Sequence, residues 1–132
     1  ALCKEAGAKR ALPLNVSVPS HCALMKPAAE KLQAAFEDVQ FNAPHIPVVQ
    51  NVNAAIGEDP NQIKQNLIKQ LYAPVLWVDS VKTMAANGTE KILECGPGKV
   101  LSGLIRRIEP DISCFASEDP EALAGAIEDF SA

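Results

Sequence analysis

The sequence predicts an α/β fold built around a small parallel sheet, and three observations support this prediction. Short apolar stretches typical of strands alternate with helical patterns, as in proteins whose helices cross over between parallel strands. Asp-Pro pairs at Asp59-Pro60 and Asp119-Pro120 are typical of helix starts. Of the 132 residues, 48% are apolar and 21% are charged, which is typical of a globular domain with a core.

The expected elements in chain order are a helix end over residues 1–8, a strand over 10–18, a helix from Ala23, a strand over 45–52, a helix from Pro60, a helix around Trp77, a strand over 91–95, a turn and helix over 96–108, a strand over 112–116 and a helix from Pro120. The helix end closes near Gly7. Apolar residues at every second position define the strand that follows, and Pro13 would place that strand at a sheet edge.

From Ala23 the apolar period changes from that of a strand to that of a helix. The residues expected on its inner face are Leu24, Ala28, Leu32 and Ala35 or Phe36. Pro27 fits only because it falls in the first turn. The apolar run over 45–52 then indicates a buried strand.

A carboxylate cap at Asp59 begins the next helix, whose apolar face is expected to hold Ile63, Leu67, Ile68 and Leu71. Pro74 separates it from a second helix, where Trp77, Val81 and Met84 should face the core. Asn87-Gly88 should end that helix.

The stretch 91–95 is predicted to be a short buried strand that leads into a glycine-rich turn. In the helix that follows, the residues expected to face inward are Val100, Leu101, Leu104, Ile105 and Ile108. Pro110 ends it, and the last helix should bury Leu123, Ile127 and Phe130. Three short strands after residue 45 make a thin sheet with an open edge, so we expect part of the fold to lie outside the chain.

Charge and hydropathy exclude several classes of partner. The formal charge is −4, so nucleic acid and anionic membrane are not expected partners. No apolar run reaches the roughly 20 residues that a membrane helix needs. The start of the chain has no signal-peptide core and is typical of a helix already under way, so we expect the chain to be a piece of a longer protein.

The cysteines are too irregularly spaced for a metal site, and we expect no metal. They are Cys3, Cys22, Cys95 and Cys114. Three of the four have apolar neighbours and are expected to be small buried hydrophobic residues. Nothing supports a disulfide, so we favour a reducing, cytoplasmic setting.

The glycine-rich stretch "CGPGKVLSG" (95–103) lies where phosphate loops often occur. It matches neither phosphate-binding pattern, since Val100 follows Lys99 and Leu101 stands in place of a third glycine. We interpret it as a tight turn that lets a strand and a helix pack closely. Arg106-Arg107, near the end of the same helix, are typical of macrodipole compensation on a solvated face.

Of the two histidines, His45 is interpreted as a partly exposed loop residue. His21 follows Pro19-Ser20 at the point where a strand pattern gives way to a helix, a common place for functional side chains. Two interpretations stay open for His21, a chemical role and a structural role at the helix start. A dyad with Cys22 is weakly supported, because adjacent side chains seldom face each other.

Four stretches occur together in the order and spacing of a known family. They are "LPLNVSVPSHCALMKPAAEKL", "FNAPHIPVVQNV", "KQLYAPVLWVDSVKTM" and "ECGPGKVLSGLIRRI". The chain closely resembles the C-terminal part of bacterial malonyl-CoA:acyl-carrier-protein transacylases of type II fatty-acid synthesis. The resemblance implies the C-terminal part of an α/β-hydrolase-like parallel-sheet domain over 17–132. It also implies that residues 1–16 are the last helix and strand of an inserted ferredoxin-like small domain.

By the same resemblance, malonyl passes from CoA to a serine and then to the phosphopantetheine thiol of acyl carrier protein, with no cofactor. The Pro-Ser-His motif implies that His21 is the general base, and Lys-Gln-Leu-Tyr-x-Pro-Val implies that the backbone carbonyl of Gln70 orients it. Ser20 stands where relatives vary with acyl choice. The family's serine elbow, oxyanion hole and malonyl-binding arginine have no match in this chain, so we expect it to be inactive alone.

Three hypotheses compete. The first is an enzyme portion that supplies the histidine base and needs the missing N-terminal segment or chain as a partner. The second is a catalytically silent fragment or binding module that engages acidic acyl carrier protein through Lys99, Arg106 and Arg107. The third is a self-contained thiol enzyme that uses Cys22 with His21.

Overall fold

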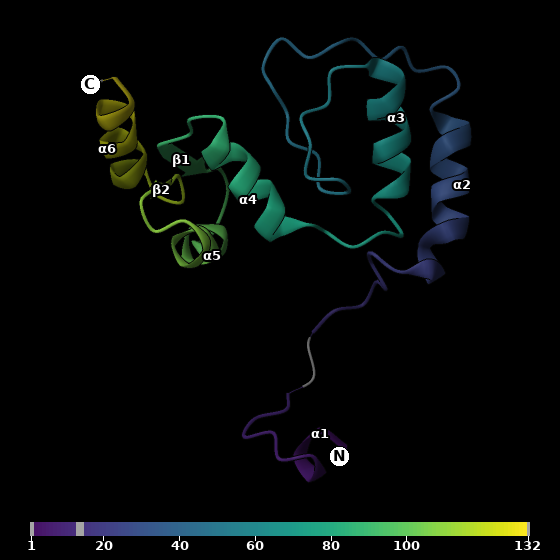
Figure 1. Ribbon diagram of the computed structural model, residues 1–132, viewed down its shortest axis with the longest axis horizontal. Coiled ribbons are helices and arrows are strands. Elements are labelled where there is room, and N and C mark those ends of the chain that lie inside the picture. The colour runs from purple at the N-terminus through teal and green to yellow at the C-terminus, as the bar shows by residue number, and fades with distance from the viewer. Residues whose placement is uncertain (1, 13–14, 132) are drawn as a thin grey trace.

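The computed structural model describes residues 2–12 and 15–131, and it is an α/β arrangement with a two-stranded parallel sheet. Its elements in chain order are α1 (Leu2–Glu5), the single 3-10 turn η1 (Ala23–Met25), α2 (Lys26–Ala35), α3 (Pro60–Lys69), α4 (Trp77–Ala86), β1 (Lys91–Glu94), α5 (Val100–Ile108), β2 (Ser113–Ala116) and α6 (Pro120–Ser131). Figure 1 shows two groups of elements: α2 beside α3, and α4, α5 and α6 around the two strands. α1 lies apart from both groups.

The second group is a β-α-β unit. β1 pairs with β2 in parallel, with Ile92 opposite Cys114, and α5 forms the crossover that a parallel pair requires. Its core is a cluster of Val81, Ile105 and Ile112, against which half-buried Trp77 packs. The cluster therefore joins α4, α5 and the entry to β2 and sets the position of α5.

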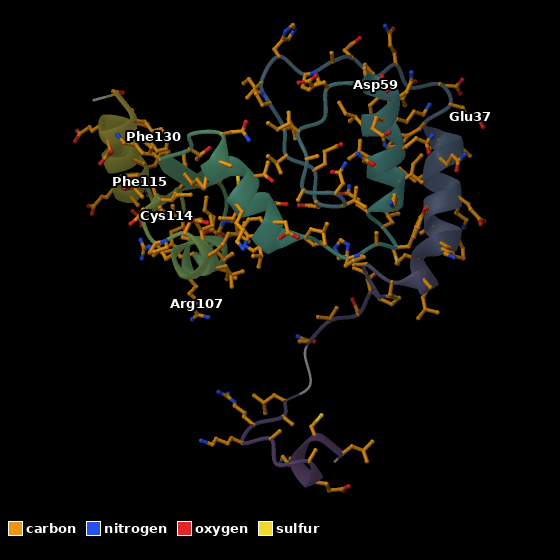
Figure 2. The ribbon with its side chains drawn as sticks, in the orientation of Figure 1. Glu37, Asp59, Arg107, Cys114, Phe115 and Phe130 are labelled. Atoms are coloured by element: carbon orange, nitrogen blue, oxygen red, sulfur yellow. The ribbon has the colours of Figure 1, made fainter. Side chains whose placement is uncertain are left out.

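The last helix packs on the outer strand of the sheet. Phe115 of β2 and Phe130 of α6 meet edge to face, with ring centroids 5.6 Å apart. Figure 2 labels both residues on this side of the molecule. Such aromatic pairs contribute about 0.5–1.5 kcal/mol beyond the area that they bury. The pair closes one side of the β-α-β unit.

The predicted helix starts are confirmed. The carboxylate of Asp59 accepts from the backbone N–H groups of Asn61 (3.2 Å) and Gln62 (3.1 Å), two donors that the first turn of α3 leaves free. Asp119 accepts from the Ala122 N–H at 2.8 Å and starts α6 in the same way. The predicted end of α4 is also confirmed, since Gly88 follows it with a φ of +83°.

Two predicted strands are wrong. In the described part of 10–18 no strand forms, and Val16 is 69% exposed; the predicted edge position of Pro13 falls outside the described residues. The stretch 45–52 makes only an isolated antiparallel bridge between Val49 and Ile56. A strand is stabilised by a run of hydrogen bonds to a neighbour, and within the described residues neither stretch finds a partner that extends beyond this single bridge.

Several side chains predicted to face the core are exposed instead. Leu24 is 74% exposed, Val100 72% and Ile127 58%, whereas Ile105 is nearly buried at 2%. A two-stranded sheet has too little surface to cover the whole apolar stripe of each helix. The cysteine prediction is also wrong: Cys3 and Cys95 are exposed, while Cys22 and Cys114 are half-buried. Cys3 is exposed because α1 lies apart from the other elements (Figure 1).

Candidate active site

His21 stands at the turn between the extended segment that precedes it and η1, with a φ of +60°. This left-handed conformation costs a residue with a side chain about 1–2 kcal/mol, although histidine is among the residues that adopt it more often. The backbone N–H of His21 donates to the carbonyl of Leu71 at 3.0 Å, so the residue after α3 holds the strained turn in place. Strained residues held in this way are frequent at functional sites.

The imidazole of His21 contacts the same end of α3. Its Nδ1 lies 2.8 Å from the backbone carbonyl oxygen of Gln70, the residue that caps α3. The last carbonyls of a helix have no partner within the helix, so this oxygen is free to accept a hydrogen bond. In the neutral ring Nδ1 then carries the proton, and Nε2 is left as the acceptor.

Two features of this contact suit a base. The imidazole is exposed, so a reacting group can approach Nε2. The hydrogen bond from Nδ1 to the Gln70 carbonyl also fixes the orientation of the ring, so Nε2 stays available as the acceptor.

The two residues beside His21 form hydrogen bonds with the backbone and not with the imidazole. Ser20 is exposed, and its backbone N–H donates to the Val18 carbonyl at 2.8 Å. The Cys22 thiol donates to the Pro19 carbonyl at 3.2 Å, so its hydrogen bond is to the backbone and not to the imidazole. The geometry therefore gives no support to a Cys22–His21 dyad.

A cavity of about 360 Å³ lies beside the α3 end that holds His21. Gln70 forms part of its wall, together with apolar residues of α3 and amide side chains of the segment that passes α3. The polar wall residues are Asn42, Gln50, Asn51, Asn66 and Gln70. The wall has no charged side chain, so the cavity suits neutral groups.

The glycine-rich turn does not carry a phosphate site. The carboxylate of Glu94 accepts from the backbone N–H groups of Leu101 (3.0 Å) and Ser102 (2.8 Å) and from the Ser102 hydroxyl (2.7 Å). These donors hold the pKa of Glu94 below its ordinary value, with the Ser102 backbone N–H as the main cause. The N-terminus of α5, where an anion would bind, is therefore occupied by the protein's own carboxylate, which supports the tight-turn interpretation.

The sequence pattern missed this role of Glu94. Its signal was present, because the carboxylate precedes a helix start with no other capping side chain. The spacing of seven residues to Leu101 hid it, since the capping patterns that are recognised in sequence span about three residues.

The predicted docking residues Lys99, Arg106 and Arg107 lie on and beside α5. In Figure 1 this helix is well apart from α2 and α3. Lys99 forms an ion pair with Glu118, and the hydrogen bond and charge of Glu118 raise the pKa of Lys99. Arg106 donates to the Cys114 carbonyl at 3.3 Å. Both line a cavity of about 460 Å³ between α5, β2 and α6, while Arg107 projects outward in Figure 2.

His45 is exposed in a loop, as predicted. Among residues 2–12 and 15–131, no three His, Cys, Asp or Glu side chains gather in a way that could hold a metal ion. None of the helices in these ranges is long and apolar enough to span a membrane.

Known proteins match this fold and this sequence over nearly the whole chain. The malonyl CoA-acyl carrier protein transacylase of Escherichia coli (strain K12) is 54% identical over 128 residues, which are 97% of this chain and 41% of that protein. An acyl carrier protein S-malonyltransferase from Vibrio cholerae superposes with a TM-score of 0.85 at 56% identity, over 94% of this chain and 40% of that one. No family model matches the chain.

A third match is a malonyl-transacylase solved in complex with its type II PKS acyl-carrier protein. Its TM-score is 0.89 at 50% identity, over 96% of this chain and 41% of that one. All three relatives are acyltransferases. This chain corresponds to the C-terminal portion of the malonyl CoA-acyl carrier protein transacylases, and it spans about 41% of the length of the curated relatives that it matches.

Proposed function

We propose that this chain supplies the histidine half of a malonyl-transfer site, with His21 as general base and acid. The observation that carries the proposal is the 2.8 Å contact between Nδ1 of His21 and the Gln70 carbonyl, which leaves Nε2 free to take a proton. The similarity to malonyl CoA-acyl carrier protein transacylases supports the substrate class. The serine nucleophile would come from the part of the transacylase that this chain does not match.

The proposed reaction has two balanced halves. In the first, Nε2 of His21 takes the serine hydroxyl proton while the serine oxygen attacks the malonyl thioester carbonyl; the C–S bond then breaks, and the CoA sulfur receives that proton. In the second, Nε2 takes the proton of the phosphopantetheine thiol of acyl carrier protein. The thiolate attacks the malonyl-serine ester, and the departing serine oxygen recovers the proton. The chemistry needs no metal and no cofactor.

Ser20 is proposed to help select the acyl group. It precedes His21 and is exposed on the same turn, so it lies next to the residue that the substrate would reach. A small hydroxyl side chain leaves more room there than an aromatic ring would. The similarity to malonyl-transferring relatives favours malonyl as this acyl group.

The segment that carries the serine is proposed as a partner of this chain. It would dock against the edge of β1 that does not pair with β2. A cavity of about 370 Å³ is lined by four consecutive residues, Ile92 to Glu94 of this strand and Cys95 just after it, and by residues 47–49 opposite. Consecutive strand residues point to opposite faces, so a cavity that reaches all four follows the strand edge. Trp77 also lines it, and its buried indole N–H finds no acceptor among the described residues. An added strand would cover this apolar edge.

Acyl carrier protein is also a proposed partner, with Lys99, Arg106 and Arg107 as its docking residues. One similar transacylase was solved in complex with its acyl-carrier protein. Arg107 projects into solvent, whereas Lys99 is paired with Glu118 and Arg106 donates to the Cys114 carbonyl, so Arg107 should contribute most. The same residues support the alternative function, a catalytically silent module that binds acyl carrier protein.

The resemblance extends to organisation and location. We propose that residues 17–132 complete an α/β-hydrolase-like domain and that residues 1–16 belong to a ferredoxin-like small domain. A cytoplasmic setting is proposed with them, since free cysteines suit a reducing compartment.

The test is a malonyl-transfer assay on the chain alone and on the chain combined with the segment of the Escherichia coli relative that it does not match. We expect turnover only from the combination. His21→Ala should reduce the rate at least about 100-fold, the lower range for loss of a general base, and the matched control His45→Ala should not change it. Clear turnover by the chain alone, or full activity of His21→Ala, would defeat the proposal.

The docking residues need a separate measurement. Arg106→Glu with Arg107→Glu should raise the KM for acyl carrier protein and leave the KM for malonyl-CoA unchanged. The matched control is charge reversal of Lys31 and Lys82, which lie on α2 and α4. An unchanged KM for acyl carrier protein in the arginine variant would remove the docking proposal and the alternative function that depends on it.

A further inference from the structure

A buried pair of amide side chains lies behind the carbonyl that holds His21. Asn66 of α3 donates from Nδ2 to Oε1 of Gln50 at 2.6 Å, and the two residues are 6% and 9% exposed. Gln62 completes the arrangement by donating from Nε2 to Oδ1 of Asn66 at 3.1 Å. A buried polar side chain is costly unless it is hydrogen-bonded, and when satisfied it restricts the elements that it joins to one arrangement.

Asn66 connects this pair to the site. It lies one turn before Gln70, and its backbone carbonyl accepts the Gln70 N–H at 2.9 Å. The carbonyl of Gln70 then faces Nδ1 of His21. One residue therefore holds the last turn of α3 through its main chain and a separate segment through its side chain.

The other half of the pair stands on a tight turn. The Gln50 N–H donates to the Ala55 carbonyl at 2.9 Å, and its carbonyl accepts from Ala54 N–H at 2.8 Å. Gly57 leaves the room that the Gln50 side chain needs, since a Cβ there would stand 2.8 Å from Gln50 Oε1. The turn is also held from the opposite side, because Thr83 of α4 donates to the Ala54 carbonyl at 2.7 Å.

We propose that Asn66 and Gln50 are positioning residues that fix the Gln70 carbonyl and so select the Nδ1-protonated tautomer of His21. Their catalytic meaning rests on the proposed role of His21 as base, whereas the effect on the tautomer does not. Leucine at position 66 has the same branching as asparagine but neither a donor nor an acceptor. It would leave Gln50 Oε1 buried without its donor and free the last turn to shift.

The experiment measures the two imidazole nitrogens of His21 by NMR in the full chain, made with ¹⁵N-labelled histidine. The chain has two histidines, so His45 is the internal reference. Asn66→Leu should lower the ratio of the Nδ1–H to the Nε2–H tautomer at His21 by about 2- to 10-fold, the range set by losing one neutral hydrogen bond. His45 should not change.

Two further variants keep the test decisive. Gln50→Met removes the acceptor without altering α3, so it carries the test if Asn66→Leu does not fold, and the same shift is expected. Thr83→Val is the matched control, because it removes a hydrogen bond to the same turn from the side of α4. An unchanged tautomer ratio in both amide variants, or an equal shift in Thr83→Val, would overturn the proposal.

The tautomer measurement and the malonyl-transfer assay can fail independently. If His21→Ala keeps full activity while Asn66→Leu still shifts the tautomer, the proposed function fails and the positioning of the ring stands. If His21→Ala is inactive and both amide variants leave the tautomer unchanged, the positioning proposal fails alone.

Discussion

Gly57 should respond to an added methyl group in the opposite sense to Gly103. A Cβ at Gly57 would stand 2.8 Å from Gln50 Oε1 and 2.9 Å from Ile63 Cγ1, whereas one at Gly103 meets nothing within 4 Å. The Gln50 oxygen cannot swing away freely, because Asn66 holds it at 2.6 Å. Gly57 does not have a left-handed φ, so the effect of Gly57→Ala is one of space alone.

The magnitudes follow from these contacts. Overpacking costs about 1–3 kcal/mol, and a displaced buried amide adds a similar amount. Alanine also restricts the unfolded chain, which offsets only about 0.4–1 kcal/mol of these costs, so Gly57→Ala should lower the free energy of unfolding by about 1–5 kcal/mol. Gly103 lies inside α5, where alanine should raise the free energy of unfolding by about 1 kcal/mol.

Urea unfolding followed by far-UV circular dichroism measures both changes. Gly57→Ala should cost less in a Gln50→Ala background than in the parent chain, because Gln50→Ala removes the oxygen nearest the new methyl group. The reasoning is refuted if the two glycine variants change the free energy of unfolding in the same direction, or if Gly57→Ala costs the same in both backgrounds.

Two other predictions concern the site and the glycine-rich turn. Gln70→Ala should keep the ¹⁵N pattern of His21 and the activity of the combined enzyme, since a backbone carbonyl does the holding; a shift as large as that of Asn66→Leu would contradict this. Glu94 has a pKa lowered by its Ser102 donors, so its stabilising contribution is present above the unfolded carboxyl pKa of about 4.3 and is lost as pH falls through the lower folded value. Urea midpoints between pH 2 and 7 should therefore show Glu94→Gln less stable than the parent only at the higher pH. A difference between the two midpoints that grows as the pH falls would contradict the prediction.

The contact between His21 and Gln70 shows how far sequence reasoning reaches. Local pattern left a chemical and a structural role open for His21, and only the resemblance of whole motifs paired it with Gln70. Forty-nine residues separate the two, and no periodicity spans that distance. The structure adds that Leu71 also holds His21, through a backbone contact that leaves no mark on residue identity.

The two amide residues could not have been predicted from the chain. Asn66 has Gln62 and Gln70 one turn away on either side, so its residue type does not mark it as buried. Its partner Gln50 comes from a stretch predicted to be a strand that instead folds back in a tight turn. The pair exists only because that turn meets α3.

Local sequence was sufficient for the helix starts at Asp59 and Asp119, for β1 and β2, and for the turn at Gly88. These features depend on residues a few positions apart, whose capping and apolar period act before any distant contact forms. Tertiary structure alone decided that 45–52 makes no sheet and that Glu94 closes the start of α5. Strand pairing and buried polar contacts need partners that are distant along the chain, and the energy of such contacts is set by which segments meet.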